Sequence, residues 1–268
     1  SLMSRSHLPI AVSSCFLCLT IVWSQSSSVP RDDAAAVAQS FHTAYPSTVL
    51  SHTDSGITLV NGRMFTSRSH APEDAYERML DAATLADMLN IPYAKGVATG
   101  VPPRNHDPGR ARHTAFFDAM YGGTPAAVKK ACTGIRWVDG TSLQCTRING
   151  VDHHLQSIAD EFRRSHPRLL PYLTRPGGTL VWRTIAGTHR RSAHSYGIAI
   201  DINVERSDYW RTAGTRDTEV VYRNRIPQEI VDVFERHGFI WGGKWYHYDT
   251  MHFEFRPELC PPACSCQR

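Results

Sequence analysis

The chain has 268 residues, of which 41% are hydrophobic and 20% charged, with a formal net charge of +4. These proportions are typical of a soluble globular protein whose core fills one large domain or two small ones. The charge is small and scattered, and no Lys- and Arg-rich block occurs, so we expect no nucleic-acid partner.

The first elements along the chain have the order of a secretory signal. Arg5 precedes the apolar run 8–23, and small polar residues follow at 24–28. This order predicts a signal peptide over residues 1–28 and export to the periplasm or the extracellular space. The run is short for a membrane span, which needs about 20 apolar residues, so no stable span is expected after removal of the signal. An uncleaved anchor and a lipoprotein site at Cys15 are the alternatives.

Residues 29–148 are predicted to form an N-terminal extension that is helical and rich in loops. Small polar residues without a clear period fill 29–60, apart from one short helix at 34–41. Helical composition follows at 73–89, up to the turn before Pro92, and two further short helices are expected at 112–121 and 124–131.

The cysteines that remain after removal of a signal favour an oxidising compartment. Cys132 and Cys145 are the natural disulfide pair, whose short loop would stabilise the fold by about 3 kcal/mol. The tail holds Cys260, Cys264 and Cys266, for which we expect one disulfide and a spare thiol rather than a metal site, because no histidine lies nearby.

Residues 149–268 are predicted to form the core of an α+β fold. Apolar residues recur at helical spacing from Val151 to Phe162, and Pro167 ends that helix. Strands are predicted at 179–185, 198–203 and 251–255, with a helix at 226–237 and a turn at 241–243. We expect a small antiparallel sheet with the two helices, 151–166 and 226–237, on one face.

Two short strings contain the residues that can carry chemistry. In the first, a strand at 198–203 turns its isoleucines to the core and Asp201 to the other face, where a buried carboxylate needs a cation. Gly197 permits a bend that lets His194 fold back toward Asp201. In the second, alternation from Met251 to Phe255 puts His252 and Glu254 on the face away from the core.

Asp249 has the wrong parity for that face, so we place it in the turn before the strand. Two histidines and one carboxylate leave the fourth tetrahedral position of a zinc ion open, as a catalytic site requires, and a second carboxylate beside them can take a proton. The spacing of one histidine and one aspartate is weak support by itself, because most such pairs bind no metal.

The complete strings are more specific, and they resemble the zinc D-alanyl-D-alanine carboxypeptidase family (the VanY-like group), which includes L-alanyl-D-glutamate endopeptidases. Their pattern is Ser-x-His-x-x-Gly-x-Ala-x-Asp at 192–201 and Asp-x-Met-His-Phe-Glu at 249–254, and the resemblance extends over about 149–259. It implies a Hedgehog-like and D,D-peptidase-like fold, Zn²⁺ as the cofactor, and the peptide stem of peptidoglycan as the substrate. It also implies that His194, Asp201 and His252 bind zinc and that Asp249 is the catalytic base.

The resemblance further implies an arginine that meets the substrate or the developing oxyanion. Arg183 is the best candidate, although Arg190 and Arg191 lie closer to the first motif and any of the three could be simply solvated. Ser192 binds substrate or caps a turn, and Trp245 lines the cleft or packs on the core. Glu254 is expected to orient a ligand imidazole. His247, His189, His153 and His154 are expected to be surface or packing residues.

These observations predict a zinc metallopeptidase that cuts a bond in the peptidoglycan stem. They favour a D-alanyl-D-alanine carboxypeptidase. An endopeptidase of the L-alanyl-D-glutamate type is one alternative. A catalytically silent, zinc-containing wall-binding module is another, against which the presence of Asp249 argues, because a structural site needs no base.

Overall fold

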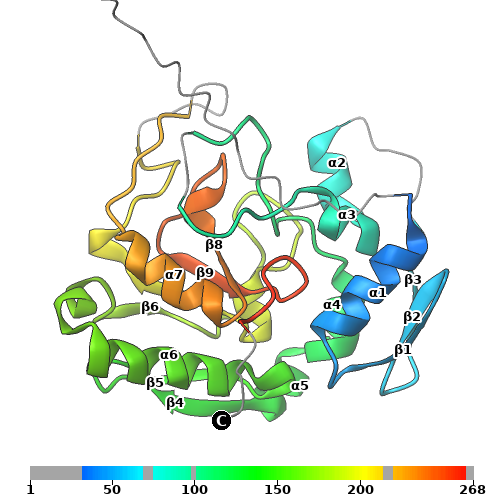
Figure 1. Cartoon of the computed structure of the whole chain (residues 1–268), viewed down its shortest axis with the longest axis horizontal. Coiled ribbons are helices and arrows are strands. Elements are labelled where there is room, and N and C mark those ends of the chain that lie inside the picture. The colour runs from blue at the N-terminus through cyan, green and yellow to red at the C-terminus, as the bar shows by residue number, and fades with distance from the viewer. Residues whose placement is uncertain (1–31, 69–74, 98–100, 214–219, 264–268) are drawn as a thin grey trace, which may run out of the picture.

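A computed structural model of the chain describes residues 32–68, 75–97, 101–213 and 220–263 (Figure 1). The predicted signal peptide and the tail residues Cys264 and Cys266 lie outside these ranges. Within the described part of the chain, no helix combines the length and the apolar character needed to cross a membrane.

The N-terminal part begins with a helix and a small sheet. Helix α1 (Ala34–Ala44) confirms the helix predicted at 34–41, and its first turn is capped by the Asp33 carboxylate, which accepts a hydrogen bond from Ala36 N. The antiparallel meander β1 (Val49–Thr53), β2 (Gly56–Leu59) and β3 (Met64–Thr66) was not predicted. Its strands are only 5, 4 and 3 residues long, so the alternation in them is too short to mark a strand in the sequence.

Four short helices follow, and all of them fall in segments predicted to be helical. They are α2 (Tyr76–Asp81), α3 (Leu85–Asn90), α4 (Thr114–Tyr121) and α5 (Pro125–Ala131). Helices α3 and α5 begin at capping threonines, Thr84 and Thr124, whose side chains accept hydrogen bonds from backbone N–H groups of the first turn.

The predicted disulfide between Cys132 and Cys145 is absent, and among the described residues both are free thiols, as is Cys260. The two cysteines lie on a hairpin of β4 (Cys132–Arg136) and β5 (Ser142–Thr146), in which Cys145 pairs with Thr133 and Cys132 pairs with Thr146. Residues paired across an antiparallel sheet share a face and neighbours along a strand do not, so the two thiols point to opposite faces. The two cysteines are one residue out of register across the hairpin, and this offset is the reason that the disulfide does not form.

The central sheet has four antiparallel strands in the order β6-β7-β9-β8. They are β6 (Pro176–Gly178), β7 (Ala199–Asn203), β9 (His252–Phe255) and β8 (Phe239–Trp241). The strands predicted at 198–203 and 251–255 are confirmed. The strand predicted at 179–185 is wrong, because the chain leaves the sheet at Gly178 and forms an irregular loop that turns back on residues 190–194. The short strand β8 was not predicted.

Helices α6 (Val151–Ser165) and α7 (Gln228–Arg236) confirm the two predicted core helices. Helix α7 lies beside β8 and β9, whereas α6 packs on the hairpin β4–β5 and reaches β9 through His154, which stacks on Phe255 (Figure 1). Phe234 of α7 stacks on Phe253 of β9 with ring centroids 3.9 Å apart, and Phe162 of α6 contacts Phe234. This apolar layer covers one face of β9. His252 and Glu254 alternate with Phe253 and therefore project from the other face, as the sequence predicted.

The division of the chain at residue 148 stays a prediction, but side chains from both sides of it share one hydrophobic cluster, from Val37 of α1 to Cys260. Tyr45 donates a hydrogen bond to Glu258 Oε2, 213 residues away, at 2.6 Å. The N-terminal segments are thus packed directly against the part of the chain that holds β9.

Candidate functional site

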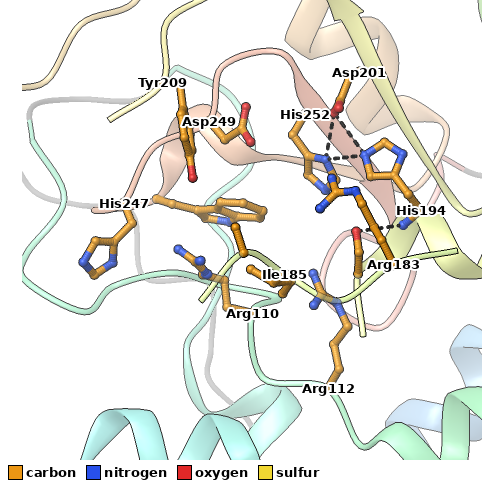
Figure 2. A pocket seen from close by; sticks show the side chains of 13 residues that line it. Arg110, Arg112, Arg183, Ile185, His194, Asp201, Tyr209, His247, Asp249 and His252 are labelled. Atoms are coloured by element: carbon orange, nitrogen blue, oxygen red, sulfur yellow. Dashed lines mark hydrogen bonds and ion pairs between the residues drawn. The ribbon is translucent and has the colours of Figure 1, made fainter. Parts of the chain in front are cut away.

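His194, Asp201 and His252 converge on one point beside the two inner strands of the central sheet, β7 and β9 (Figure 2). The register of β7 and β9 places Asp201 directly opposite His252. His194 approaches from the 3₁₀ turn Ala193–Tyr196, which ends at Gly197, whose φ of +67° is a conformation that glycine adopts readily. The distances are 3.2 Å from His194 Nε2 to Asp201 Oδ1, 3.0 Å from His252 Nδ1 to the same oxygen, and 3.3 Å between the two nitrogens.

The proton positions on both imidazoles are set by groups outside this cluster. His194 Nδ1 lies 3.0 Å from the carbonyl oxygen of Thr179, which can only accept, so Nδ1 carries the proton. His252 Nε2 lies 2.9 Å from Glu254 Oε2 and donates to this carboxylate. The remaining nitrogen of each neutral ring then presents a lone pair toward the other ring and toward Asp201.

Three acceptor atoms at such short distances repel one another unless a cation lies between them. Two imidazole nitrogens and one carboxylate oxygen are a donor set that zinc prefers, and donors at its usual bond lengths of about 2.0–2.2 Å are separated by about 3.3 Å in a tetrahedral site. The observed separations match this value, so the residues fit a zinc ion with three protein ligands.

Glu254 is fully buried and balanced by two arginines as well as by His252. Arg112 Nη2 lies 2.9 Å from Oε2, and Arg256 Nη1 lies 2.9 Å from Oε1. Burial raises the pKa of the Glu254 carboxyl, but the charges of Arg112 and Arg256 and the hydrogen bond from His252 outweigh it, and the pKa is held well below its usual range. The geometry agrees with the prediction that Glu254 orients the imidazole of His252.

We expect Glu254→Gln to weaken both zinc binding and the fold. Glutamine keeps an acceptor for His252 but removes the charge that neutralises Arg112 and Arg256, and breaking a buried ion pair costs about 3–5 kcal/mol. Loss of the partner of a metal-binding histidine lowers metal affinity by about 10- to 100-fold. Urea unfolding of the metal-free protein and zinc titration against a competing chelator measure the two effects.

The matched control is Glu229→Gln, because Glu229 forms an exposed ion pair with Arg168. Such pairs contribute about 0–1 kcal/mol, so this variant should keep nearly the stability and zinc affinity of the unchanged protein. Equal behaviour of the two variants would contradict the role assigned to Glu254.

The three converging residues open into a pocket with a volume of about 120 Å³ (Figure 2). All seven residues predicted for the site line it: His194, Asp201, His252, Asp249, Arg183, Ser192 and Trp245. The pocket thus unites side chains that the sequence predicted from two separate strings.

Asp249 precedes β9 and contacts Gly242 through a backbone hydrogen bond of 3.0 Å from Asp249 N to Gly242 O. A Cβ atom at position 242 would lie 2.5 Å from Asp249 O, so glycine is required for this close approach. Asp249 Oδ1 is buried and has no hydrogen-bond partner among the described residues. Burial and the nearby charge of Asp201 raise the pKa of the Asp249 carboxyl to about 6.

The three candidate arginines have different surroundings. Arg190 forms ion pairs of 2.9 Å with both Glu77 and Asp81. Arg191 pairs with Asp118 and does not line the pocket. Arg183 lines the pocket, and no ion pair of its guanidinium occurs within the described ranges. Of the three, Arg183 alone is therefore placed to meet a ligand in this pocket.

For Ser192 and for Trp245, the structure agrees with both of the roles considered, a structural one and a place in the pocket lining. Ser192 Oγ accepts a long hydrogen bond of 3.4 Å from His194 N and so caps the turn, yet it also lines the pocket. Trp245 is anchored by a hydrogen bond of 2.7 Å from Nε1 to Pro108 O, and its ring lies 5.5 Å from that of His252.

Six further residues line the pocket and were not predicted as site residues: Arg110, Arg112, Ile185, Ala186, Tyr209 and His247. His247 is buried and its Nδ1 lies 2.6 Å from Asp107 Oδ2, which agrees with the predicted packing role. Arg110 and Arg112 come from the N-terminal extension, where an Arg-x-Arg sequence without a motif around it gave no signal of a site.

Residues 186–255 match the protein family described as D-alanyl-D-alanine carboxypeptidase. The matched segment contains all three converging residues and Asp249, but not Arg183. Comparisons with curated proteins and with solved structures gave no match. The resemblance predicted from the sequence is therefore confirmed: over residues 186–255, this chain matches the D-alanyl-D-alanine carboxypeptidase family.

Proposed function

We propose that the protein is a zinc metallopeptidase that hydrolyses a peptide bond in the peptidoglycan stem, and that it acts as a D-alanyl-D-alanine carboxypeptidase. The family match supports a peptidase acting on cell-wall peptides, and the convergence of His194, Asp201 and His252 supports zinc as its cofactor. Export, which the signal at residues 1–28 predicts, would bring the protein to this substrate and is part of the same proposal.

The three converging residues would hold the metal, and bound zinc supplies Lewis acidity that makes water a nucleophile near neutral pH. Asp249 would take the proton of the attacking water on a carboxylate oxygen and then deliver it to the leaving amine. Its raised pKa suits both steps, because a carboxyl that titrates close to neutral pH can accept and release a proton. Arg183 would stabilise the negative charge that develops on the carbonyl oxygen.

The observation that carries the proposal is the buried oxygen of Asp249, which has no partner among the described residues and lies beside three side chains that fit a zinc ion. An unsatisfied buried carboxylate is unfavourable for folding, so a structural zinc module has no reason to keep it. This favours the enzyme over the catalytically silent wall-binding module.

The test is digestion of purified muropeptides by the zinc-loaded protein, with the products identified by mass. Loss of a terminal alanine is expected. Cleavage within the stem would instead support the L-alanyl-D-glutamate type of endopeptidase. Unchanged muropeptides in the presence of stoichiometric zinc would overturn both forms of the proposal, and treatment with a chelator should abolish any activity that is found.

A further inference from the structure

Residues 106–112, which precede the family-matched region, form one wall of the pocket. Three carbonyl oxygens of this segment accept hydrogen bonds from the chain on either side of His252: His106 O from Tyr246 N, Pro108 O from Trp245 Nε1, and Gly109 O from Arg256 Nη1. The segment is thus fixed to the site, although more than 130 residues separate the partners. Arg110 and Arg112 line the pocket from this wall (Figure 2).

The two arginines differ in what their guanidinium groups contact. Arg112 donates to Glu254 and so supports His252. The guanidinium of Arg110 lies over the ring of Trp245, with its central carbon 5.6 Å from the ring centroid. Its ion pair with Asp107 Oδ2 is long, at 3.9 Å.

Asp107 is already occupied by closer donors, which explains the long distance to Arg110. Its Oδ2 accepts from Tyr76 OH at 2.8 Å and from His247 Nδ1 at 2.6 Å, and its Oδ1 accepts from His247 N at 2.9 Å. Asp107 therefore attracts Arg110 without occupying its donors. No hydrogen bond of the Arg110 guanidinium is found over residues 32–68, 75–97, 101–213 and 220–263.

Stacking on Trp245 and attraction by Asp107 hold this cation in place before any ligand binds. The side chain is only 19% exposed, so a bound anion would be largely removed from water. A guanidinium offers paired N–H donors that match the two oxygens of a carboxylate, and charge-assisted pairs of this kind are strong. The two acids that line the pocket, Asp201 and Asp249, have roles of their own under the proposed function.

We propose that Arg110 binds a carboxylate of the peptide substrate and thereby selects substrates that carry one next to the scissile bond. The inference rests on the proposed peptidase function and adds a specificity residue that the family-matched region does not contain. The carboxylate is the free C-terminus of a peptide ending in D-alanyl-D-alanine or the α-carboxylate of a glutamate within the stem. Substrates amidated at one position or the other distinguish the two.

The experiment compares three synthetic stem peptides on the zinc-loaded full chain: one with both carboxylates free, one with a C-terminal amide, and one with the glutamate α-carboxylate amidated. One amidation should lower kcat/KM by about 10- to 100-fold, mainly through KM. Arg110→Gln should lower kcat/KM on the peptide with both carboxylates free by a similar factor. In this variant, the free peptide and the amidated peptide that the unchanged protein disfavours should be cleaved equally well. Arg110→Lys should restore part of the discrimination.

The control is Arg104→Gln, which removes the same charge at an exposed position just before residues 106–112. It should leave the discrimination unchanged, and all variants should keep their zinc content and melting temperature. Equal loss on all three peptides in Arg110→Gln, or no loss, would overturn the inference. If the unchanged protein cleaves none of the peptides, the proposed function fails, and calorimetric binding of the same peptides still shows whether Arg110 distinguishes carboxylate from amide.

Discussion

His194→Ala should remove the zinc ion together with all peptidase activity. His194 supplies one of three donors that lie 3.0–3.3 Å apart, and its imidazole is held for this purpose by the hydrogen bond to Thr179 O. A site with two remaining ligands cannot hold zinc at micromolar concentration with the geometry of a catalytic centre. Metal analysis after dialysis should find one zinc per chain in the unchanged protein and far less in the variant.

Thermal melting gives a second measurement that does not depend on activity. A metal that binds only the folded chain stabilises it by about 2.7 kcal/mol at a concentration 100-fold above Kd, so added zinc should raise the melting temperature of the unchanged protein and not that of His194→Ala. His189→Ala is the matched control, because His189 is exposed in the same loop and does not line the pocket. Full zinc occupancy in His194→Ala would refute the ligand set.

The parts of the fold that the sequence predicted well are those whose side chains alternate or recur by local rules. Helix α6 shows its apolar stripe in the sequence. The segment 198–203 shows three alternating isoleucines, all fully buried: Ile198 just before β7, and Ile200 and Ile202 within it. The α+β class with small antiparallel sheets is confirmed, whereas the likeness to the Hedgehog type of fold stays a prediction. The meander β1–β3 and the hairpin β4–β5 escaped prediction because their strands are at most 5 residues long and their pairing depends on register.

The site was predictable where its residues lie in contiguous motifs. The two strings gave His194, Asp201, His252 and Asp249, and the alternation along β9 also placed Glu254 beside His252. What the sequence could not reveal is the contribution of residues 106–112. The ion pair between Arg112 and Glu254 joins positions 142 residues apart, and no local pattern reports a contact of that separation. Only the tertiary contacts of residues 106–112 show that Arg110 lines the pocket.

Asp249→Asn should lower the rate of hydrolysis by about 10²- to 10⁴-fold, which is the usual contribution of a general acid and base. Asparagine has nearly the same shape but cannot accept and return a proton. The zinc content should stay at one per chain, because Asp249 is not among the three converging donors. Peptide hydrolysis and metal analysis on the same sample therefore separate a lost catalyst from a lost metal.

The stability of this variant should remain equal or rise, which distinguishes Asp249 from a structural carboxylate. Its buried Oδ1 has no partner in the described part of the chain, and its charge lies close to that of Asp201, so the ionised group is unfavourable in the metal-free fold. A neutral amide relieves the repulsion, as substitutions of functional groups often do. Asp54→Asn, at an exposed turn between β1 and β2, should change neither rate nor stability. A drop in melting temperature with full activity in Asp249→Asn would mean that the carboxylate supports the fold and that the proton acceptor is another group.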